Sequence, residues 1–172
     1  MKILLWLAVI VSLASCTTTY YVVRHADRLD NSYNSPLSGP GQTRAVALRD
    51  TLLSKGIDSI FISTFLRTEQ TAQPLATATG ITMFRYPPDT TDGLIRRLKK
   101  INGKDVLIVG HSDKVPLIVQ GLRHWQQHDP RSADWQVISM GERHPPVALA
   151  PARPCQVKGK LNLNDYATLI SE

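Results

Sequence analysis

Two arginines and two histidines follow short apolar runs of the chain and could together bind and attack a phosphate group: Arg24, His25, Arg67 and His111. Arginine presents a planar fork of N–H donors that matches phosphate oxygens, so Arg24 and Arg67 could hold a dianionic group from two sides. A neutral imidazole can attack phosphorus and form a covalent intermediate that water later resolves. A second imidazole, if protonated, would donate to the same oxygens and stabilise the transferring group. This chemistry needs no metal and no cofactor.

The elements that must position these side chains are strands and helices that alternate from residue 20 onward. Short runs of β-branched and aromatic residues predict strands at 20–23, 59–62, 81–86 and 106–109. Apolar residues at helical spacing predict helices with the following bounds: Ser38 to Gly56, 65–78 before Gly80 with a perturbation at Pro74, 94–101 before Gly103, and a last helix capped by Ser112. The alternation predicts an α/β fold, namely one three-layer domain with a mostly parallel sheet and helices on both faces.

The carboxyl ends of parallel strands meet at one edge of a sheet, where ligands bind. Arg24 with His25, Arg67, and His111 follow three different predicted strands, so we expect them to converge there. Helix N-termini near Thr64 and Ser112 would add backbone donors. Beyond Leu122 the pattern weakens. We interpret that stretch as loops or an insertion, with 166–170 as a last edge strand.

Three motifs, in this order, resemble those of the histidine phosphatase superfamily, in the branch that includes phosphoglycerate mutases and small phosphohistidine phosphatases. They are VVRHADR at 22–28, the SxxxRTxQTA pattern at 63–72, and VGHS at 109–112. Each follows a predicted strand, and together they cover roughly residues 20–122. The resemblance implies a phosphoglycerate mutase-like fold.

The resemblance also implies a role for each matched position. His25 would be the nucleophile that becomes phosphorylated. Arg24, Arg67 and His111 would form the phosphate pocket, with Ser112 as a further substrate-binding residue. The side chains expected to support this pocket are Ser63 and Thr68.

The proton donor for the leaving group is left open among four carboxyl groups: Asp89, Asp92, Asp113 and Asp27. Asp89 is the favoured candidate, because the acid in this branch commonly follows the third strand. Asp92 and Asp113 could instead interact with helix dipoles, and Asp27 could line the pocket wall.

The first residues indicate an exported protein. Lys2, the apolar run at 3–11 and the small residues that follow predict a signal peptide over residues 1–15. Residues 13–16 resemble the lipobox of bacterial lipoproteins, which implies a lipid on Cys16, a tether over 16–19 and a domain over 20–172. A plain secretory cleavage near Ser15 is the alternative. We expect anchorage in the cell envelope, at the periplasmic side of the outer membrane if the envelope is Gram-negative.

Composition limits the partners. Without the leader about 157 residues remain, enough for one domain. The net charge of +6 suits anionic substrates, but only 6% of the residues are aromatic and no basic stripe is interleaved with them, so nucleic acid is not expected. His124 and His128 are four residues apart without a third ligand at matched spacing, so no metal site is expected. If Cys16 is lipidated, Cys155 has no disulfide partner.

These observations predict a metal-independent phosphomonoesterase that acts on a small phosphorylated substrate as a monomer, through a phosphohistidine on His25. The nucleophile elbow of serine hydrolases is a poor fit, because Lys114 replaces the last glycine of that motif. The alternative function is a lipoprotein that binds phosphate or a phosphoester without turnover.

Overall fold

The computed structural model describes residues 18–128 and 134–138. The elements in chain order are β1 (Thr19–Arg24), α2 (Gly39–Leu52), η1 (Leu53–Lys55), β2 (Ser59–Ser63), α3 (Leu66–Thr79), β3 (Met83–Tyr86), α4 (Thr91–Leu98), β4 (Asp105–Gly110), α5 (Val115–His128) and β5 (Asp134–Ile138). Some predictions concern residues outside the described ranges. They are the signal peptide at 1–15, the lipid on Cys16, the unpaired Cys155 and the strand at 166–170.

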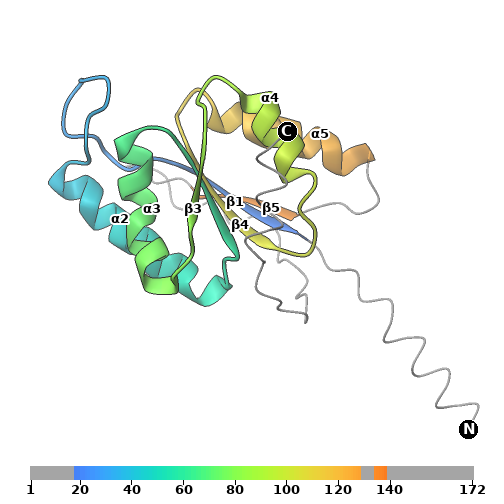
Figure 1. The fold of residues 1–172 in the computed structure, drawn as a ribbon, viewed down its shortest axis with the longest axis horizontal. Coiled ribbons are helices and arrows are strands. Elements are labelled where there is room, and N and C mark those ends of the chain that lie inside the picture. The colour runs from blue at the N-terminus through green and yellow to red at the C-terminus, as the bar shows by residue number, and fades with distance from the viewer. Residues whose placement is uncertain (1–17, 129–133, 139–172) are drawn as a thin grey trace, which may run out of the picture.

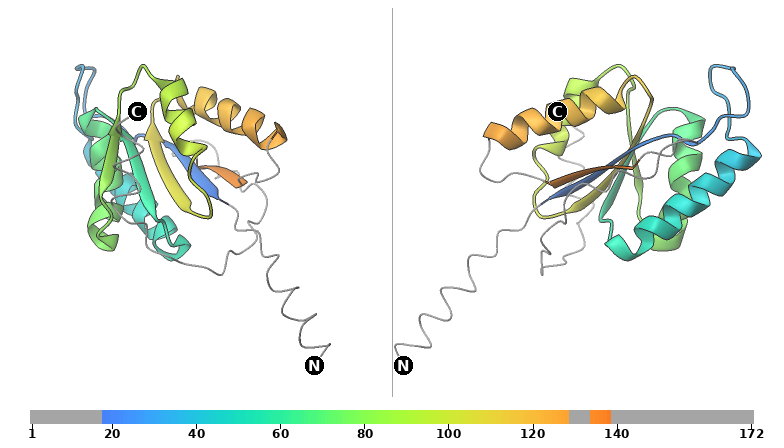
Figure 2. Two further views of the ribbon diagram at one scale, coloured as in Figure 1. Left: turned by 45° about the vertical axis from the view of Figure 1, so that its right-hand side comes forward. Right: turned by 180° about the vertical axis from the view of Figure 1, so that it is seen from behind.

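The strands form one five-stranded sheet in the order β3-β2-β4-β1-β5, and every pairing is parallel. Figures 1 and 2 show α2 with α3 on one face of this sheet and α4 with α5 on the other. The side chains of β1 alternate between the two faces. Tyr20 and Val22 pack in the core beneath α4 and α5, whereas Tyr21 and Val23 pack in the core beneath α2 and α3. The predicted three-layer α/β fold is confirmed.

The predicted start and stop signals explain most helix ends. Ser38 caps α2, because its hydroxyl accepts a hydrogen bond from the N–H of Gly41 at 3.1 Å. Gly56 and Gly80 end their helical segments at φ values of 69° and 72°, which favour glycine. Helix α3 continues through Pro74, so the perturbation predicted there does not end the helix.

The structure corrects the prediction for the end of the core. Helix α5 continues beyond Leu122 to His128, where we expected loops or an insertion. Strand β5 then pairs in parallel with β1 and forms the edge of the sheet next to it. Ser112 does not cap this helix directly, because it lies in a turn that precedes Val115. Helix α4 ends at Leu98, earlier than predicted.

Hydrogen bonds fix the chain where it enters the sheet, at Thr18 and Thr19. Thr18 is buried, and its hydroxyl donates to the carbonyl of Ile101 at 3.2 Å and accepts from the N–H of Gly103 at 2.8 Å. Next to it, the N–H of Thr19 donates to the carbonyl of Lys104 at 2.9 Å. The beginning of β1 is therefore joined to the turn before β4. Over residues 18–128 and 134–138, no helix is long and apolar enough to cross a membrane.

Candidate functional site

His25 is the first residue after β1, and the structure holds it in a defined tautomer. Its backbone N–H donates to the carbonyl of Gly110 at 2.9 Å, which ties the end of β1 to the end of β4. Its ring Nδ1 lies 2.7 Å from the carbonyl oxygen of Ala26. Because a carbonyl can only accept, Nδ1 carries the hydrogen, and in the neutral ring Nε2 keeps its lone pair. The geometry prepares Nε2 to act as a nucleophile.

His111 follows β4 and is the second ring of the site. The centroids of the His25 and His111 rings are 5.3 Å apart, with an angle of 63° between their planes. Nε2 of His111 lies 2.8 Å from Oγ of Ser63, and Nδ1 lies 3.4 Å from Nη2 of Arg67. A guanidinium can only donate, so Nδ1 accepts and Nε2 carries the hydrogen.

The predicted supporting residues lie beneath this ring. Ser63 accepts from His111 and is 3.1 Å from the hydroxyl of Thr68, to which it can donate. The single hydroxyl hydrogen of Thr68 is in turn shared between the carbonyls of Phe65 and Ser63, which lie 2.7 and 2.9 Å from Oγ1. Both hydroxyl residues are fully buried. This chain of hydrogen bonds fixes the orientation of the His111 ring.

Both histidines are neutral at neutral pH. Burial lowers the pKa of His25, and the nearby guanidiniums of Arg67, Arg24 and Arg28 lower it further, whereas the hydrogen bond to Ala26 raises it. Burial also lowers the pKa of His111, to about 4, with smaller contributions in the same direction from Arg67 and His25. The protonated second histidine considered from the sequence is therefore not the resting form. A bound phosphate dianion would raise this pKa.

Arg67 lies in the first turn of α3 and is 9% exposed. Its Nη1 donates to the carbonyl of Tyr33 at 2.9 Å, and its guanidinium carbon lies 4.2 Å from the centroid of the Phe65 ring. Burial lowers the pKa of Arg67, and the charge of Arg28 adds to this effect. Its Nε is buried without a hydrogen-bond partner in the described part of the chain. A buried unpaired donor next to two imidazoles is suited to an anion.

Arg24 and Ser112 lie beside this cluster. Arg24 is the last residue of β1 and is exposed, and its charge is among those that lower the pKa of His25. Ser112 is also exposed and follows His111 directly. The structure therefore places both His25 and Arg67 against His111, and Arg24 and Ser112 are the chain neighbours of the two histidines.

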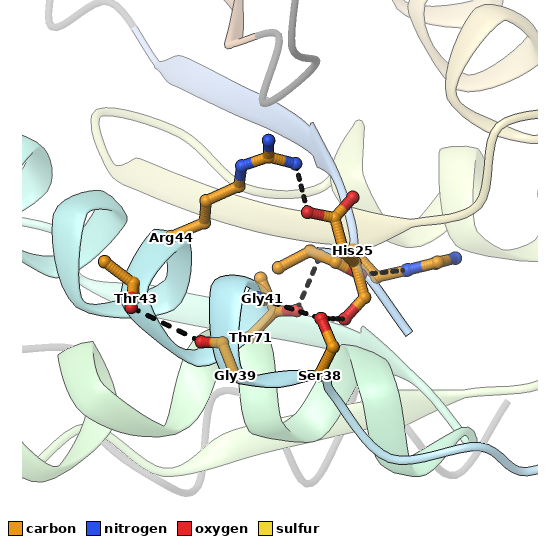
Figure 3. Close-up of polar contacts among 9 residues, drawn as sticks. His25, Ser38, Gly39, Gly41, Thr43, Arg44 and Thr71 are labelled. Carbon is orange, nitrogen blue, oxygen red and sulfur yellow. Dashed lines mark hydrogen bonds and ion pairs between the residues drawn. The ribbon is translucent and has the colours of Figure 1, made fainter. Parts of the chain in front are cut away.

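The segment that follows His25 is held by two helices. The N–H of Ala26 donates to Oγ1 of Thr71 in α3 at 3.0 Å, and the hydroxyl and N–H of Ser38 both donate to the carbonyl of Asp27. Figure 3 shows Ser38, Gly41 and Thr71 grouped around this segment near His25. A Cβ atom on Gly41 would overlap the carbonyl of Asp27, so only glycine allows this close approach of backbones.

The four candidate acids have different surroundings. The carboxylate of Asp27 forms an ion pair with Arg44 of α2, and that of Asp113 lies 3.6 Å from Nζ of Lys114. Asp92 is in the first turn of α4, which is also a favourable place for a carboxylate in a helix. Asp89 is exposed in the turn after β3. The choice of Asp89 as proton donor remains a prediction.

Sequence reasoning missed the residues that hold this site together. Gln70 accepts from the N–H of Leu37 at 2.7 Å, and Thr71 accepts from Ala26, so the end of the SxxxRTxQTA pattern fixes the loop that follows His25. A usable signal was present, because residues three and four positions after Arg67 share its side of the helix. Asn34 and Tyr33 gave no such signal, since their partners Leu66 and Arg67 lie in the first turn of α3, more than 30 positions away in the sequence. In the described parts of the chain, no three His, Cys, Asp or Glu side chains form a group that could hold a metal ion.

Comparison with known families gives two matches. Residues 20–95 match the family described as histidine phosphatase superfamily (branch 1). Residues 113–172 match a second family, described as the WsaF C-terminal domain, and most of that range lies outside the described residues. No curated protein matches the chain significantly.

Solved structures similar to this chain include several phosphatases. The protein histidine phosphatase SixA complexed with tungstate is 21% identical, with a TM-score of 0.51, and the match covers 57% of this chain and 72% of SixA. A phosphoserine phosphatase from Entamoeba histolytica is 14% identical, with a TM-score of 0.50 and coverages of 62% and 80%. A mycobacterial glucosyl-3-phosphoglycerate phosphatase is 16% identical, with a TM-score of 0.50 and coverages of 59% and 79%.

These structures confirm the predicted phosphoglycerate mutase-like fold. The family match over residues 20–95 supports the prediction of a phosphoric monoester hydrolase. The match to the histidine phosphatase superfamily (branch 1) over residues 20–95 contains the first two motifs, at 22–28 and 63–72, whereas the third motif, at 109–112, lies beyond it.

Proposed function

We propose that this protein is a metal-independent phosphomonoesterase that forms a phosphohistidine on His25. One observation supports this most directly. Nδ1 of His25 donates to Ala26, so the nucleophilic lone pair is on Nε2, in a ring 5.3 Å from that of His111. Arg67, with a buried unpaired Nε, supplies donors for the phosphate in contact with His111.

In the first step, Nε2 of His25 attacks phosphorus in line with the ester oxygen. The N–P bond forms as the P–O bond breaks, and the leaving oxygen departs with the electron pair and takes up a proton. Arg24 and Arg67 neutralise the charge on the transferring oxygens. The carbonyl of Ala26 stabilises the positive charge that develops on the imidazole during attack, because it accepts the Nδ1 hydrogen.

In the second step, water attacks the phosphohistidine. The new P–O bond forms as the N–P bond breaks, the electron pair returns to Nε2, and inorganic phosphate leaves. The acid that protonates the leaving group in the first step can remove a proton from this water in the second. Asp89 is our candidate for that group.

The sequence also supports a place for this activity. The apolar leader and the lipobox-like residues 13–16 support a lipid on Cys16 and anchorage of the mature protein in the bacterial envelope. Fractionation of cells that express the wild type and Cys16→Ser tests this proposal. We expect Cys16→Ser to leave the membrane fraction, and unchanged membrane association would contradict lipidation.

Turnover is tested with purified mature protein and p-nitrophenyl phosphate. We expect phosphate release by the wild type and a loss of at least 1,000-fold, on the order found for removed nucleophiles, in His25→Ala. When the reaction with phosphate-labelled substrate is quenched rapidly without acid, the wild-type protein should carry the labelled phosphoryl group and the variant should carry none. Equal rates in the two proteins would contradict the catalytic role of His25.

A lipoprotein that binds phosphate without turnover is the second candidate. One observation favours it, namely that Asp27 and Asp113 have basic partners and Asp89 is exposed. In that case inorganic phosphate would bind tightly, binding would weaken in Arg67→Ala, and no labelled phosphoenzyme would form.

A further inference from the structure

The loop between β1 and α2 presents an exposed aromatic side chain next to the phosphate site. Figures 1 and 2 show this loop projecting beyond the body of the domain. Tyr33, which lies in the loop, is 83% exposed. Its backbone carbonyl nevertheless accepts a hydrogen bond from Arg67, the arginine that contacts His111. The side chain of Tyr33 is thus solvent-exposed at a residue joined directly to the site.

A row of rings leads from Tyr33 to the site. The Tyr33 and Phe65 ring centroids are 5.0 Å apart at an angle of 62°, and those of Phe65 and His111 are 5.0 Å apart at 84°. Both contacts are edge-to-face, which is a favourable arrangement for aromatic pairs. Phe65 also packs against the guanidinium of Arg67. The Tyr33 ring is the outer end of this row, and most of its surface is open to a ligand.

The loop is built to hold Tyr33 in this place. The N–H of Leu29 donates to the carbonyl of Pro36 at 2.8 Å and closes the loop at its base. The N–H of Leu66, the first residue of α3, donates to Oδ1 of Asn34 at 2.8 Å, so Asn34 caps that helix from the loop. Ser35 is fully buried between these two contacts. Exposure of Tyr33 is therefore a property of an ordered loop.

Charge and leaving-group chemistry agree with an aromatic substrate. Arg28, at the base of the loop, lies close enough to lower the pKa of both His25 and Arg67, although burial is the larger cause for each. Cations attract the faces of aromatic rings, so a guanidinium near the site favours an aromatic leaving group. A phenol also has a pKa of about 10, so an aryl oxide leaves without much help from an acid. This suits a site in which two of the candidate acids pair with basic side chains.

We propose that Tyr33 determines specificity by contacting the leaving group, and that the substrate is an aryl phosphomonoester such as a phosphorylated tyrosine side chain. The proposal rests on the proposed function, because it takes the phosphate to occupy the site formed by His25, Arg67 and His111. As Nε2 of His25 bonds to phosphorus, the bond to the aryl oxygen breaks. The aryl oxide leaves with the electron pair and is protonated by solvent, and water then hydrolyses the N–P bond.

Binding of two phosphonates tests the ring contact without any turnover. Phenylphosphonate and methylphosphonate present the same dianionic head group, and their C–P bonds are not hydrolysed. Calorimetry with the mature protein should give tighter binding of the phenyl compound. In Tyr33→Ala we expect the phenyl-to-methyl affinity ratio to fall by about 2–12-fold, the range of an aromatic contact. Tyr33→Phe should keep the ratio.

Leu29→Ala is the matched control, because Leu29 is the other large apolar side chain exposed on this loop, at 62%. It should keep the ratio. An unchanged ratio in Tyr33→Ala, or cyclohexylphosphonate bound as tightly as phenylphosphonate, would overturn the proposal. The wild type could bind phenylphosphonate more tightly than methylphosphonate and still release phosphate from no ester. That result would contradict the proposed function and would leave the ring contact supported.

Turnover then identifies the substrate class. We compare kcat/KM of wild type and Tyr33→Ala on phenyl phosphate, O-phosphotyrosine and glycerol phosphate. Each loss is calculated for one substrate, so intrinsic differences in reactivity cancel. We expect the loss to be several-fold larger for both aryl esters. Equal losses on all three would show that Tyr33 acts only on the shape of the site, and would overturn the assignment of an aromatic substrate.

Discussion

Nε2 of His111 lies 2.8 Å from Oγ of Ser63, and both residues are buried at the carboxyl ends of neighbouring strands. The bond links the motif at 63–72 to the motif at 109–112. It also decides which nitrogen of His111 is protonated, since Arg67 donates to the other one. The orientation of the His111 ring therefore depends on the hydroxyl of Ser63, which in the proposed mechanism does not itself need to touch phosphate.

We expect Ser63→Ala to lower stability and activity together. The substitution leaves the Nε2 hydrogen of His111 buried without its acceptor, which typically costs about 1–3 kcal/mol. Urea unfolding should show this loss, and kcat/KM should fall roughly tenfold because the ring loses its fixed orientation. Ser59→Ala is the control, since Ser59 is in the same strand and equally buried, but its hydroxyl has no hydrogen-bond partner within the residues described. An equal effect of the two changes would contradict the role of Ser63.

Stability should fall as the pH is lowered through the range in which His111 titrates. Its pKa is about 4 in the folded protein and about 6.5 when unfolded, so below pH 6.5 the unfolded chain binds the proton first. The contribution of His111 to the free energy of unfolding should drop by roughly 2 kcal/mol between pH 7 and pH 5. Urea titrations at several pH values, with His111→Asn as the comparison, measure this. The variant should show a smaller loss, and identical slopes would contradict the shifted pKa.

Gly41→Ala should disturb the nucleophile segment from a distance. The added Cβ would overlap the carbonyl of Asp27, two residues after His25, so either α2 or that segment must move. We expect a destabilisation of about 1–3 kcal/mol, as for other overpacked positions, and a clear fall in kcat. Gly39→Ala is matched to it, because Gly39 is in the same helical turn with nothing within 4 Å of an added Cβ. That change should be neutral or slightly stabilising, and equal losses in both variants would argue against a specific overlap.

The cap that Asn34 provides for α3 can be tested by removing its side chain. Asn34→Ala deprives the N–H of Leu66 of its acceptor, and lost caps cost about 0.5–2 kcal/mol. Because α3 begins one residue before Arg67, KM should also rise. Asn31→Ala in the same loop removes only an exposed bond to Arg28 and should change stability by less than about 0.5 kcal/mol. Thermal unfolding should give a lower melting temperature for Asn34→Ala than for Asn31→Ala. Equal melting temperatures of the two variants would contradict a capping role.

The predicted proton donor can be separated from its neighbours by leaving-group dependence. If Asp89 is the acid, Asp89→Asn should reduce kcat on alkyl phosphates by 100-fold or more, in the range of general acid catalysis, and have much less effect on p-nitrophenyl phosphate. Asp92→Asn is the control, since Asp92 lies in the first turn of α4. A uniform effect of Asp89→Asn on all substrates would show that Asp89 is not the donor.

Much of this arrangement could be predicted because it follows from periodicity. The buried runs in β1, β2 and β4 are apolar and β-branched, so the residues after them had to meet at one edge of a parallel sheet. The end of the core was predicted less well. Strand β5 has only five positions, and although Trp135, Val137 and Ile138 are apolar, so short a run gives a weak pattern. The end of α5 contains glutamine and histidine, which also weaken the pattern.

The loop around Tyr33 could not be predicted for a different reason. Its contacts join Asn34 to Leu66 and Tyr33 to Arg67, residues that are 32 and 34 positions apart. Such pairs depend on the conformation of the whole loop, which has no repeating pattern to reveal it. The same holds for the candidate proton donor, since Asp89 lies in a turn between β3 and α4.

The hydrogen bonds of Thr18 have a consequence for how an anchored enzyme would be oriented. They fix the chain where β1 begins, whereas His25 follows the end of the same strand. Six residues of strand span about 20 Å, so a lipid on Cys16 would leave β1 as a rigid spacer between the bilayer and the phosphate site. With such an anchor, His25 would lie at the end of β1 that is remote from Cys16, within reach of dissolved esters and of phosphorylated side chains on other proteins.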